Sequence, residues 1–323
     1  MAIAVLLFIV GLVCLIKGGD WFVDGACGIA RRFNLSELII GATVVSIGTT
    51  LPEVMVSATS AIEGHSEIAY GNAIGSIICN TALISALTMA IRPGKVDKSR
   101  LKIPVIFFFI AAAFYCIMAY ANGGFPRAAG IILLAIFILY MFISIKNMKT
   151  QETSPAQQNS ETPAVESKPL KDILLLVIGA ALIAVGARLL VDNGTKIAES
   201  LGVPESVIAL TMVAIGTSLP ELVTAITALA KGHSALSVGN IIGANLFNLV
   251  LVSGMAITLR PFSLPSGKTI AGFNAALILD TPLMLFVMLF MTIPALLKGK
   301  LYRFQGIVLL AVYAAFCVIQ FTM

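Results

Sequence analysis

Two glutamates, placed where a charge is costly, are the residues of this chain best suited to do chemistry. Glu53 is the only charged residue in the apolar run of residues 38–62, and Glu221 is the only one in the run 206–230. Glu53 ends the motif Gly-Thr-Thr-Leu-Pro-Glu, and Glu221 ends Gly-Thr-Ser-Leu-Pro-Glu, 168 residues later. A carboxylate at the centre of a membrane span costs about 3 kcal/mol or more. Two of them at equivalent points of an internal repeat predict one site built from two halves.

The proline in each motif favours exposed backbone oxygens beside the glutamate. Pro52 has no N–H to bond the carbonyl of Gly48, and Pro220 has none for Gly216. The glycines make a break in the helix easier. A carbonyl freed at membrane depth needs a partner, and a metal cation is a suitable one.

The hydroxyls beside Glu53 extend an all-oxygen ligand set. Thr49 and Thr50 precede Glu53 by four and three residues, so they share a helix face with the carboxylate. Carboxylate, hydroxyl and carbonyl oxygens suit hard cations such as Ca²⁺ and Na⁺, whereas zinc and copper favour His and Cys. The motif therefore predicts a hard-cation site.

The span after each motif carries small polar side chains at i,i+4 spacing. They are Asn72, Ser76 and Asn80 in the first copy, and Asn240, Ala244 and Asn248 in the second. Such side chains can donate further oxygens to an ion or hold helices together. Both interpretations remain open at this point.

Composition sets the class of protein. The 323 residues are 59% hydrophobic and 11% charged, with a mean hydropathy of +1.00, whereas soluble domains have about 25% charged residues. We expect an all-α integral membrane protein in a lipid bilayer. The net charge of +5 is a small excess, and the basic residues are not clustered into a stripe that could bind nucleic acid. Five cysteines without a CxxC pair indicate buried packing residues: Cys14, Cys27, Cys79, Cys116 and Cys317.

Apolar segments long enough to span a membrane follow one another along the chain. We predict ten spans, at Ala2–Ala30, Glu37–Ile62, Ile68–Ile91, Ile103–Ala121, Phe125–Ile145, Ile173–Ala198, Glu205–Ala230, Ala235–Leu259, Ile270–Leu297 and Phe304–Phe321. A polar, Pro-containing linker separates two halves of five spans. The expected units are an N-terminal repeat at 1–146, a linker at 147–170 and a C-terminal repeat at 171–323.

The two halves are related in sequence. Val23–Pro93 aligns without gaps with Val191–Pro261, and 27 of the 71 positions are identical. Because each half has an odd number of spans, the second enters the membrane inverted, as in many secondary transporters. One set of loops carries fifteen Lys and Arg residues and the other five. By the positive-inside rule, we expect a cytoplasmic linker and both termini outside.

Two smaller features receive ordinary interpretations. His65 and His233 lie in short Gly-His-Ser turns, which we expect to be solvated. Asp192 lies four residues after Arg188, which favours a local ion pair over a role in ion binding.

The paired motifs, each followed by Gly-Asn-x-x-Gly at 71–75 and 239–243, resemble the α-repeats of the cation/Ca²⁺ antiporter superfamily. The similarity is to its Na⁺/Ca²⁺ exchanger branch, of the bacterial inner-membrane type. The resemblance implies two inverted five-helix repeats and a site between the second, third, seventh and eighth spans. It also implies a monomeric antiporter in the inner (plasma) membrane that moves Na⁺ and Ca²⁺ by alternating access, without enzymatic activity or a cofactor.

The same resemblance implies a ligand set for the transported cations. Carried over by position, it comprises the carboxylates of Glu53 and Glu221, the hydroxyls of Thr49, Thr50, Thr217 and Ser218, backbone carbonyls near Ser46 and Ala214, and Ser76 and Asn80. The eighth span departs from the pattern, because members of the family often have Ser at the position of Ala244 and Asp at that of Asn248. At position 248 the chain therefore offers an amide instead of a carboxylate.

Other functions fit parts of the pattern. A related exchanger coupled to H⁺ or K⁺ would use the same two glutamates. A cation channel could line its pore with acids, but channels usually repeat around a symmetric oligomer. An intramembrane hydrolase would need a nucleophile or a metal-hydrolase motif, which the sequence lacks.

Overall fold

Helices make up nearly all of the structure. The computed structural model describes residues 2–33, 35–151, 169–201 and 216–322. Within these ranges, nine helices are long and apolar enough to cross a membrane, and the shorter apolar helix Leu219–Ala230 adds to them. The predicted seventh span begins at Glu205, outside the described residues. The expected all-α membrane fold is confirmed, with nine to ten membrane-capable helices in the described part of the chain.

The described helices follow the predicted spans closely. They are α1 (Ala2–Arg32), α2 (Glu37–Ile40), α3 (Ser46–Glu63), α4 (Ser66–Cys79), α5 (Ala86–Ile91), α6 (Lys98–Asn122), α7 (Arg127–Gln151), α8 (Pro169–Ser200), α11 (Leu219–Ala230), α12 (Ser234–Phe247), α13 (Gly254–Leu259), α14 (Thr281–Lys298) and α15 (Arg303–Thr322). Four π-helical segments lie within or before these helices: η1 (Gly41–Val45), η2 (Asn80–Ser85), η4 (Asn248–Ser253) and η5 (Ala276–Asp280). A π segment joins α2 to α3, α4 to α5, and α12 to α13, so each of these groups forms one long helix.

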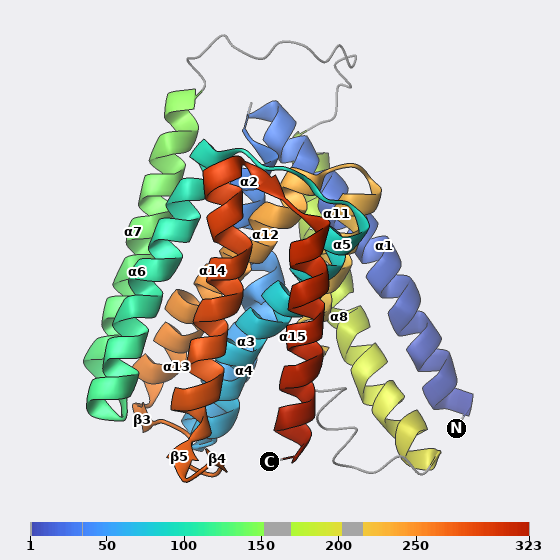
Figure 1. Cartoon of the computed structure of the whole chain (residues 1–323). Coiled ribbons are helices and arrows are strands. Elements are labelled where there is room, and N and C mark those ends of the chain that lie inside the picture. Colours follow the sequence, from blue (N-terminus) through green and yellow to red (C-terminus); the bar gives the residue numbers. More distant parts are fainter. Residues whose placement is uncertain (1, 34, 152–168, 202–215, 323) are drawn as a thin grey trace.

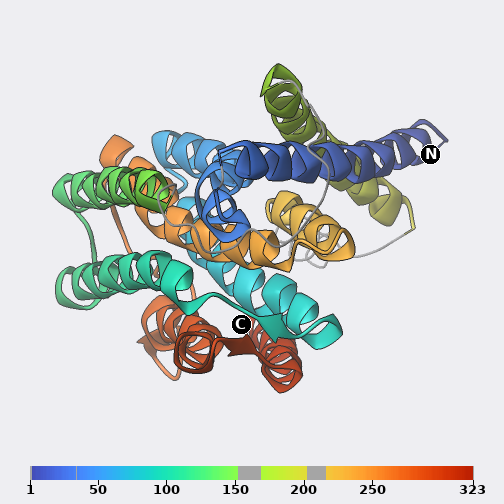
Figure 2. The ribbon, with the colours of Figure 1, turned by 90° about the horizontal axis from the view of Figure 1, so that it is seen from above.

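The helices surround a central group that contains both motifs. Figure 1 shows α3, α4, α11 and α12 in the middle, with α6 and α7 on one flank and α14 and α15 in front. The view from above shows α6 and α7 on one side of this group, α14 and α15 on another, and α1 with α8 on a third (Figure 2). The spans Ser66–Ile91 and Ser234–Leu259 are the most buried of the described helices. The spans that follow the two motifs therefore lie deepest in the interior, whereas the motif helix α3 is buried on one side and exposes Leu51 and Met55 on the other.

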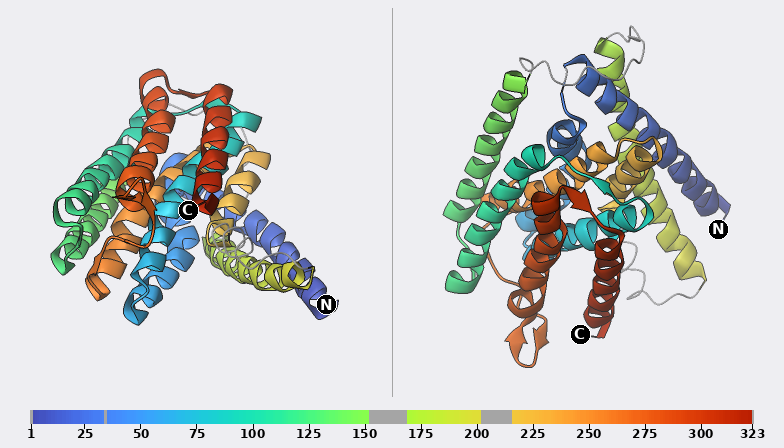
Figure 3. Two further views of the ribbon diagram at one scale, coloured as in Figure 1. Left: turned by 60° about the horizontal axis from the view of Figure 1, so that its bottom comes forward. Right: turned by 45° about the horizontal axis from the view of Figure 1, so that its top comes forward.

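Helices α1 and α8 form an antiparallel pair that projects from the rest of the molecule (Figure 3). Glycines allow the two backbones to touch: a Cβ at Gly18 would lie 2.9 Å from the carbonyl oxygen of Gly179, and one at Gly11 would lie 2.9 Å from that of Gly186. Small residues at membrane-helix interfaces permit such close packing. The first and sixth spans thus meet along a glycine-lined contact.

Short antiparallel strand pairs tie the two halves together. β1 (Gly94–Lys95) pairs with β6 (Lys300–Leu301), and β2 (Gly124–Phe125) pairs with β3 (Phe262–Ser263). Each pair joins a loop of the first half to a loop of the second. β1 and β3 also occupy equivalent repeat positions, 168 residues apart, as expected for inverted repeats.

The two faces of the bundle can be named from the chain ends. α1 begins and α15 ends at one face, which we call the terminal face (Figure 1). α7 ends and α8 begins at the opposite face, which we call the linker face. Strands β3, β4 and β5 lie at the terminal face.

The predicted start of the ninth span is wrong. Ile270 lies in a hairpin, in which β4 (Thr269–Ile270) pairs with β5 (Phe273–Asn274). Its two-residue turn places Ala271 at φ 51° and Gly272 at φ 83°, a left-handed geometry that suits tight hairpins. Because this hairpin is itself apolar, it lengthens the hydrophobic segment ahead of the ninth span. The helix predicted from hydropathy is therefore too long at its N-terminal end.

The two motifs differ in local structure. α3 continues through Pro52 without interruption, so the expected break is not found there. In the second copy, residues 217 and 218 form a turn, and Pro220 lies in the first turn of α11. Proline fits that position because the first-turn N–H groups have no partner within a helix. The predicted break is thus found in one half.

Candidate cation site

Four elements meet around the two motifs, two from each half. α3 carries Glu53 and α11 carries Glu221, and these helices contact each other. The π segment η2 contacts α11, and η4 contacts α3. η2 begins at Asn80 and η4 at Asn248, which are equivalent positions of the repeat. π-helical turns often mark functional sites, and here they flank the glutamates.

The two glutamate side chains are buried without compensating hydrogen bonds. Both residues have 0% exposure, and their carboxyl groups lie close enough to act on each other electrostatically. Among the described residues, the four carboxylate oxygens have no hydrogen-bond partner. A buried ionised group without a partner is strongly unfavourable. The pair therefore requires either protons or a bound cation.

Further polar atoms without partners surround the carboxylates. Glu221 lies beside Thr49 and Thr50 and near Cys79. Within the described ranges, the hydroxyls of Thr50 and Ser218 and both amide atoms of Asn80 and Asn248 are buried and unpartnered. Native interiors rarely leave so many polar atoms unsatisfied in one place. Several of them are oxygens, the donors that Ca²⁺ and Na⁺ prefer.

A hydrogen-bond network positions the start of α3. Ser46 Oγ lies 2.7 Å from the Gly41 carbonyl oxygen and 2.9 Å from the Asn240 carbonyl oxygen, and its one proton can be donated to either or shared between them. Thr49 Oγ1 donates to Asn240 Oδ1 at 3.2 Å. Asn240 was considered only as a repeat position of uncertain role, yet its amide oxygen joins α12 to α3. Its partners lie more than 190 residues away, so only the folded chain reveals the contact.

A glycine on α12 makes this network possible. A Cβ at Gly243 would meet the Ser46 hydroxyl and lie 2.6 Å from the Ala42 Cα. The backbones of α12 and η1 therefore approach each other more closely than any side chain would permit.

The remaining predicted ligands have different surroundings. Ser76 is buried on α4, and Thr217 is half-buried in the turn before α11. Ala214 lies outside the described residues. Asn72 serves as a helix contact, because its Nδ2 donates to the Glu53 carbonyl at 3.1 Å and to Ser57 Oγ at 2.8 Å.

One buried polar residue on the same helix as Glu221 was missed. Thr224 lies three residues after Glu221 on α11 and is fully buried, and its hydroxyl lacks a partner among the described residues. The first copy has Val56 at this position, so repeat symmetry drew no attention to it. The i,i+3 spacing from Glu221 was the available signal.

A narrow cavity reaches the motifs from the α1–α8 layer. It is lined by Phe22, Gly48, Thr49, Pro52, Ala180, Ile183, Ala184 and Pro220. Both motif prolines therefore border the same space. The cavity brings α1 and α8 next to the site and leaves Thr49 beside the opening.

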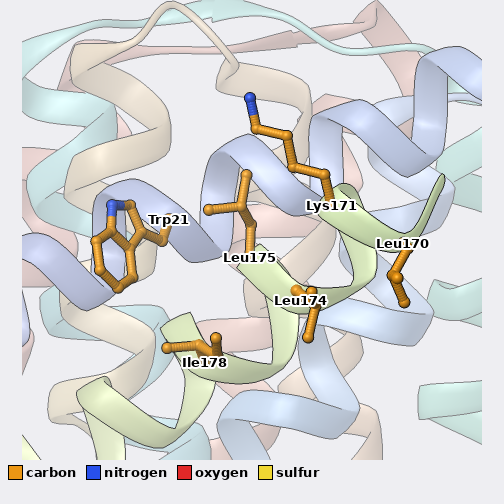
Figure 4. A pocket seen from close by; sticks show the side chains of 6 residues that line it. All are labelled: Trp21, Leu170, Lys171, Leu174, Leu175 and Ile178. Atoms are coloured by element: carbon orange, nitrogen blue, oxygen red, sulfur yellow. The ribbon is translucent and has the colours of Figure 1, made fainter. Parts of the chain in front are cut away.

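A larger hollow on the outer side of α1 and α8 has a different character. Figure 4 shows its lining, which consists of Trp21, Leu170, Lys171, Leu174, Leu175 and Ile178. Five of these six side chains are mainly apolar, and the sixth carries a positive charge. This lining offers a cation no side-chain oxygen, so it does not have the ligands of a Ca²⁺ or Na⁺ site.

Two minor sequence interpretations can be compared with the structure. Arg188 Nε lies 3.6 Å from Asp192 Oδ2, and both side chains are more than half exposed, so the predicted local ion pair is confirmed. His65 is exposed, whereas His233 is half-buried and its Nδ1 lies 2.7 Å from Glu37 Oε1. The expectation of a solvated turn is therefore wrong for His233.

Comparison with known proteins gives a consistent assignment. The model of the family described as sodium/calcium exchanger protein matches residues 3–146 and 171–322. The chain is 30% identical to the sodium/calcium exchanger MaX1 of Methanosarcina acetivorans, over 98% of each protein. It is 37% identical to the inner membrane protein YrbG of Escherichia coli, over 81% of each.

Solved structures agree with the sequence comparison. The fold matches the sodium-calcium exchanger NCX_Mj soaked with Na⁺ and Sr²⁺, with a TM-score of 0.79, 33% identity and 97% of each chain covered. This family consists of transporters of Na⁺ and Ca²⁺, which are the ions that the sequence resemblance implies as cargo. Because the family model matches nearly the whole of both halves, the chain belongs to the sodium/calcium exchanger protein family.

Proposed function

We propose that the protein is a secondary antiporter that exchanges Na⁺ for Ca²⁺ at the centre formed by Glu53 and Glu221. The observation that carries this proposal is the pair of fully buried carboxylates whose oxygens lack partners within the described part of the chain. The hydroxyls of Thr49, Thr50, Thr217 and Ser218 complete the site, together with Ser76, Asn80, Asn248 and carbonyls near Ser46 and Ala214.

Charge balance explains why this centre exchanges ions. Two carboxylates are neutralised by one Ca²⁺ or by two monovalent ions. A neutral loaded site can cross the low-dielectric barrier during alternating access, whereas an empty dianionic site would cost far more. Movement of the site without cargo is thereby suppressed, and exchange is favoured over leak.

The membrane arrangement belongs to the same proposal. The repeats 1–146 and 171–323 form the inverted halves of a monomer in the inner (plasma) membrane. The linker 147–170 is cytoplasmic and both termini are outside. Two observations support this arrangement: α7 ends and α8 begins at the face opposite the chain ends (Figure 1), and the basic loop residues divide fifteen to five.

Purified protein in liposomes gives the direct test. An outward Na⁺ gradient should drive saturable Ca²⁺ uptake, and Glu53→Gln and Glu221→Gln should each abolish it, because each removes one of the two balancing charges. Glu63→Gln is a matched control, since Glu63 is an exposed glutamate at the end of α3. Near-normal uptake by Glu53→Gln or Glu221→Gln would disprove the site.

The same assay separates the alternative functions. The chain also matches sodium/potassium/calcium exchanger 1 of Gallus gallus, at 26% identity over 50% of the chain, so K⁺ is varied as well. Uptake that needs K⁺, or that a pH gradient drives without Na⁺, would reassign the coupling ion. Ca²⁺ flux that needs no counter-ion would indicate a channel.

A further inference from the structure

Three side chains from three separate segments meet near the linker face, outside the two-glutamate centre. Cys27 lies on α1, Glu37 is the first residue of α2, and His233 is the N-cap of α12. The Cys27 Sγ, a Glu37 carboxylate oxygen and a His233 ring nitrogen all lie within 4.8 Å of one another. We propose that these side chains form a binding site for a divalent cation of the Zn²⁺ class.

The donor atoms determine which cation the site accepts. Sulfur, nitrogen and oxygen together suit Zn²⁺ and chemically similar ions, whereas Ca²⁺ and Na⁺ require oxygen alone. Zinc binds sulfur at about 2.3 Å and nitrogen or oxygen at about 2.0–2.2 Å in a tetrahedral arrangement. Ligand atoms of such a tetrahedral site lie about 3–4 Å apart, so a cluster whose ligand atoms lie within 4.8 Å of one another needs only small side-chain movements. The 2.7 Å contact between His233 Nδ1 and Glu37 Oε1 opens as the ion enters.

The three side chains are buried to different extents, so the cluster is accessible to solvent from one side. Cys27 is 2% exposed, whereas the side chains of His233 and Glu37 are 25% and 33% exposed. A cation can therefore arrive from the linker face, and a water molecule can occupy a fourth coordination position. Three protein ligands with one open position are a common zinc arrangement.

Charge balance also supports a divalent ion. On binding, the Cys27 thiol loses its proton to solvent, Glu37 is ionised and His233 binds as neutral imidazole, so two negative charges meet two positive ones. The other charges nearby cancel: Lys231 Nζ lies 2.8 Å from Asp24 Oδ1 and 3.4 Å from Asp20 Oδ1, and Arg31 adds a second positive charge close to Cys27.

The complete set of three residues occurs at only one of the two equivalent places in the internal repeat. The other place therefore provides a control. Glu37 and His233 correspond to Glu205 and His65 by the 168-residue offset, but Cys27 corresponds to Thr195. A threonine hydroxyl is a poor zinc ligand, so the sulfur exists in one half alone. A bound ion would link α1 to the starts of α2 and α12, three segments that are distant in sequence.

Cd²⁺ is the probe for this site, added alone to the purified full-length protein in detergent at neutral pH. Thiolate ligation of Cd²⁺ produces an ultraviolet charge-transfer absorption that a cysteine with only a packing role does not give. We expect this absorption in wild type and its loss in Cys27→Ser. His233→Gln and Glu37→Gln should weaken Cd²⁺ affinity by at least about tenfold. The matched controls His65→Gln and Cys116→Ser should behave as wild type.

This test is independent of the transport proposal. Excess Ca²⁺ and the Glu53→Gln substitution should leave the Cd²⁺ absorption unchanged, because they affect the all-oxygen centre. The inference is overturned by a wild type without the absorption, by a Cys27→Ser variant that retains it, or by wild-type affinity in His233→Gln and Glu37→Gln.

Discussion

At the scale of residues, the absence of a carboxylate at position 248 has a measurable consequence. Asn248 is fully buried at the start of η4, and in the described structure both of its amide atoms lack partners. Asn248→Asp should raise Ca²⁺ affinity by about tenfold, or about 1.4 kcal/mol, because it adds a negative charge to the centre. The gain should grow as pH rises, since protons compete with Ca²⁺ for the new carboxylate.

Calcium titrations of wild type and variant across pH test this expectation. Asn80→Asp is the matched variant, because Asn80 occupies the equivalent position at the start of η2 and should respond in the same direction. If the affinity of Asn248→Asp relative to wild type fell with rising pH, residue 248 would not face the ion.

The sequence was informative about residues where the cost of burial is high. Glu53 and Glu221 could be singled out because a lone carboxylate in an apolar run demands an explanation. Asn240 and the Cys27–Glu37–His233 cluster could not be found in this way. Their contacts join residues far apart in the chain, and a single sequence carries no distance between them.

At the scale of elements, the close approach of α12 to η1 depends on one glycine. Gly243→Ala would place a Cβ against the Ala42 backbone and the Ser46 hydroxyl. Such overpacking costs about 1–3 kcal/mol. We therefore expect a lower Tm in thermal denaturation of the detergent-solubilised protein, together with slower Ca²⁺ uptake, because Ser46 helps to fix the start of α3.

Gly75→Ala is the control for this substitution. Gly75 is the repeat counterpart of Gly243, but a Cβ there would meet no described atom within 4 Å. Alanine favours a helix over glycine by about 1 kcal/mol, so Gly75→Ala should leave the Tm unchanged or raise it. Equal destabilisation by both substitutions would show that the contact with η1 is not the cause.

Span positions were predictable but helix geometry was not. Nine of the predicted spans agree with described helices because about 20 apolar residues are a strong signal. The π segments at Asn80 and Asn248 escaped prediction, since one extra residue in a turn hardly changes an almost wholly apolar pattern. The hairpin at 269–274 was missed for the same reason: hydropathy does not distinguish an apolar turn from a helix.

At the scale of the whole molecule, the orientation in the membrane can be tested by labelling. We expect a cysteine in Ser160→Cys to remain unlabelled by an impermeant thiol reagent in intact cells, because the linker is proposed to be cytoplasmic. Ser266→Cys, in an exposed loop next to the terminal-face hairpin, should be labelled. The opposite pattern would invert the topology and contradict the positive-inside argument.

The strand pairs between the halves have a consequence for biosynthesis. β1 emerges from the ribosome about 200 residues before its partner β6, and β2 about 140 residues before β3. At a synthesis rate of about 5–20 residues per second, strands β1 and β2 remain unpaired for several seconds or longer before β6 and β3 are made. The final packing around Glu53 must therefore follow synthesis of the second half. Until then, the newly inserted N-terminal helices expose the surfaces that later contact the second half. Membrane chaperones and proteases can bind these exposed surfaces during this interval.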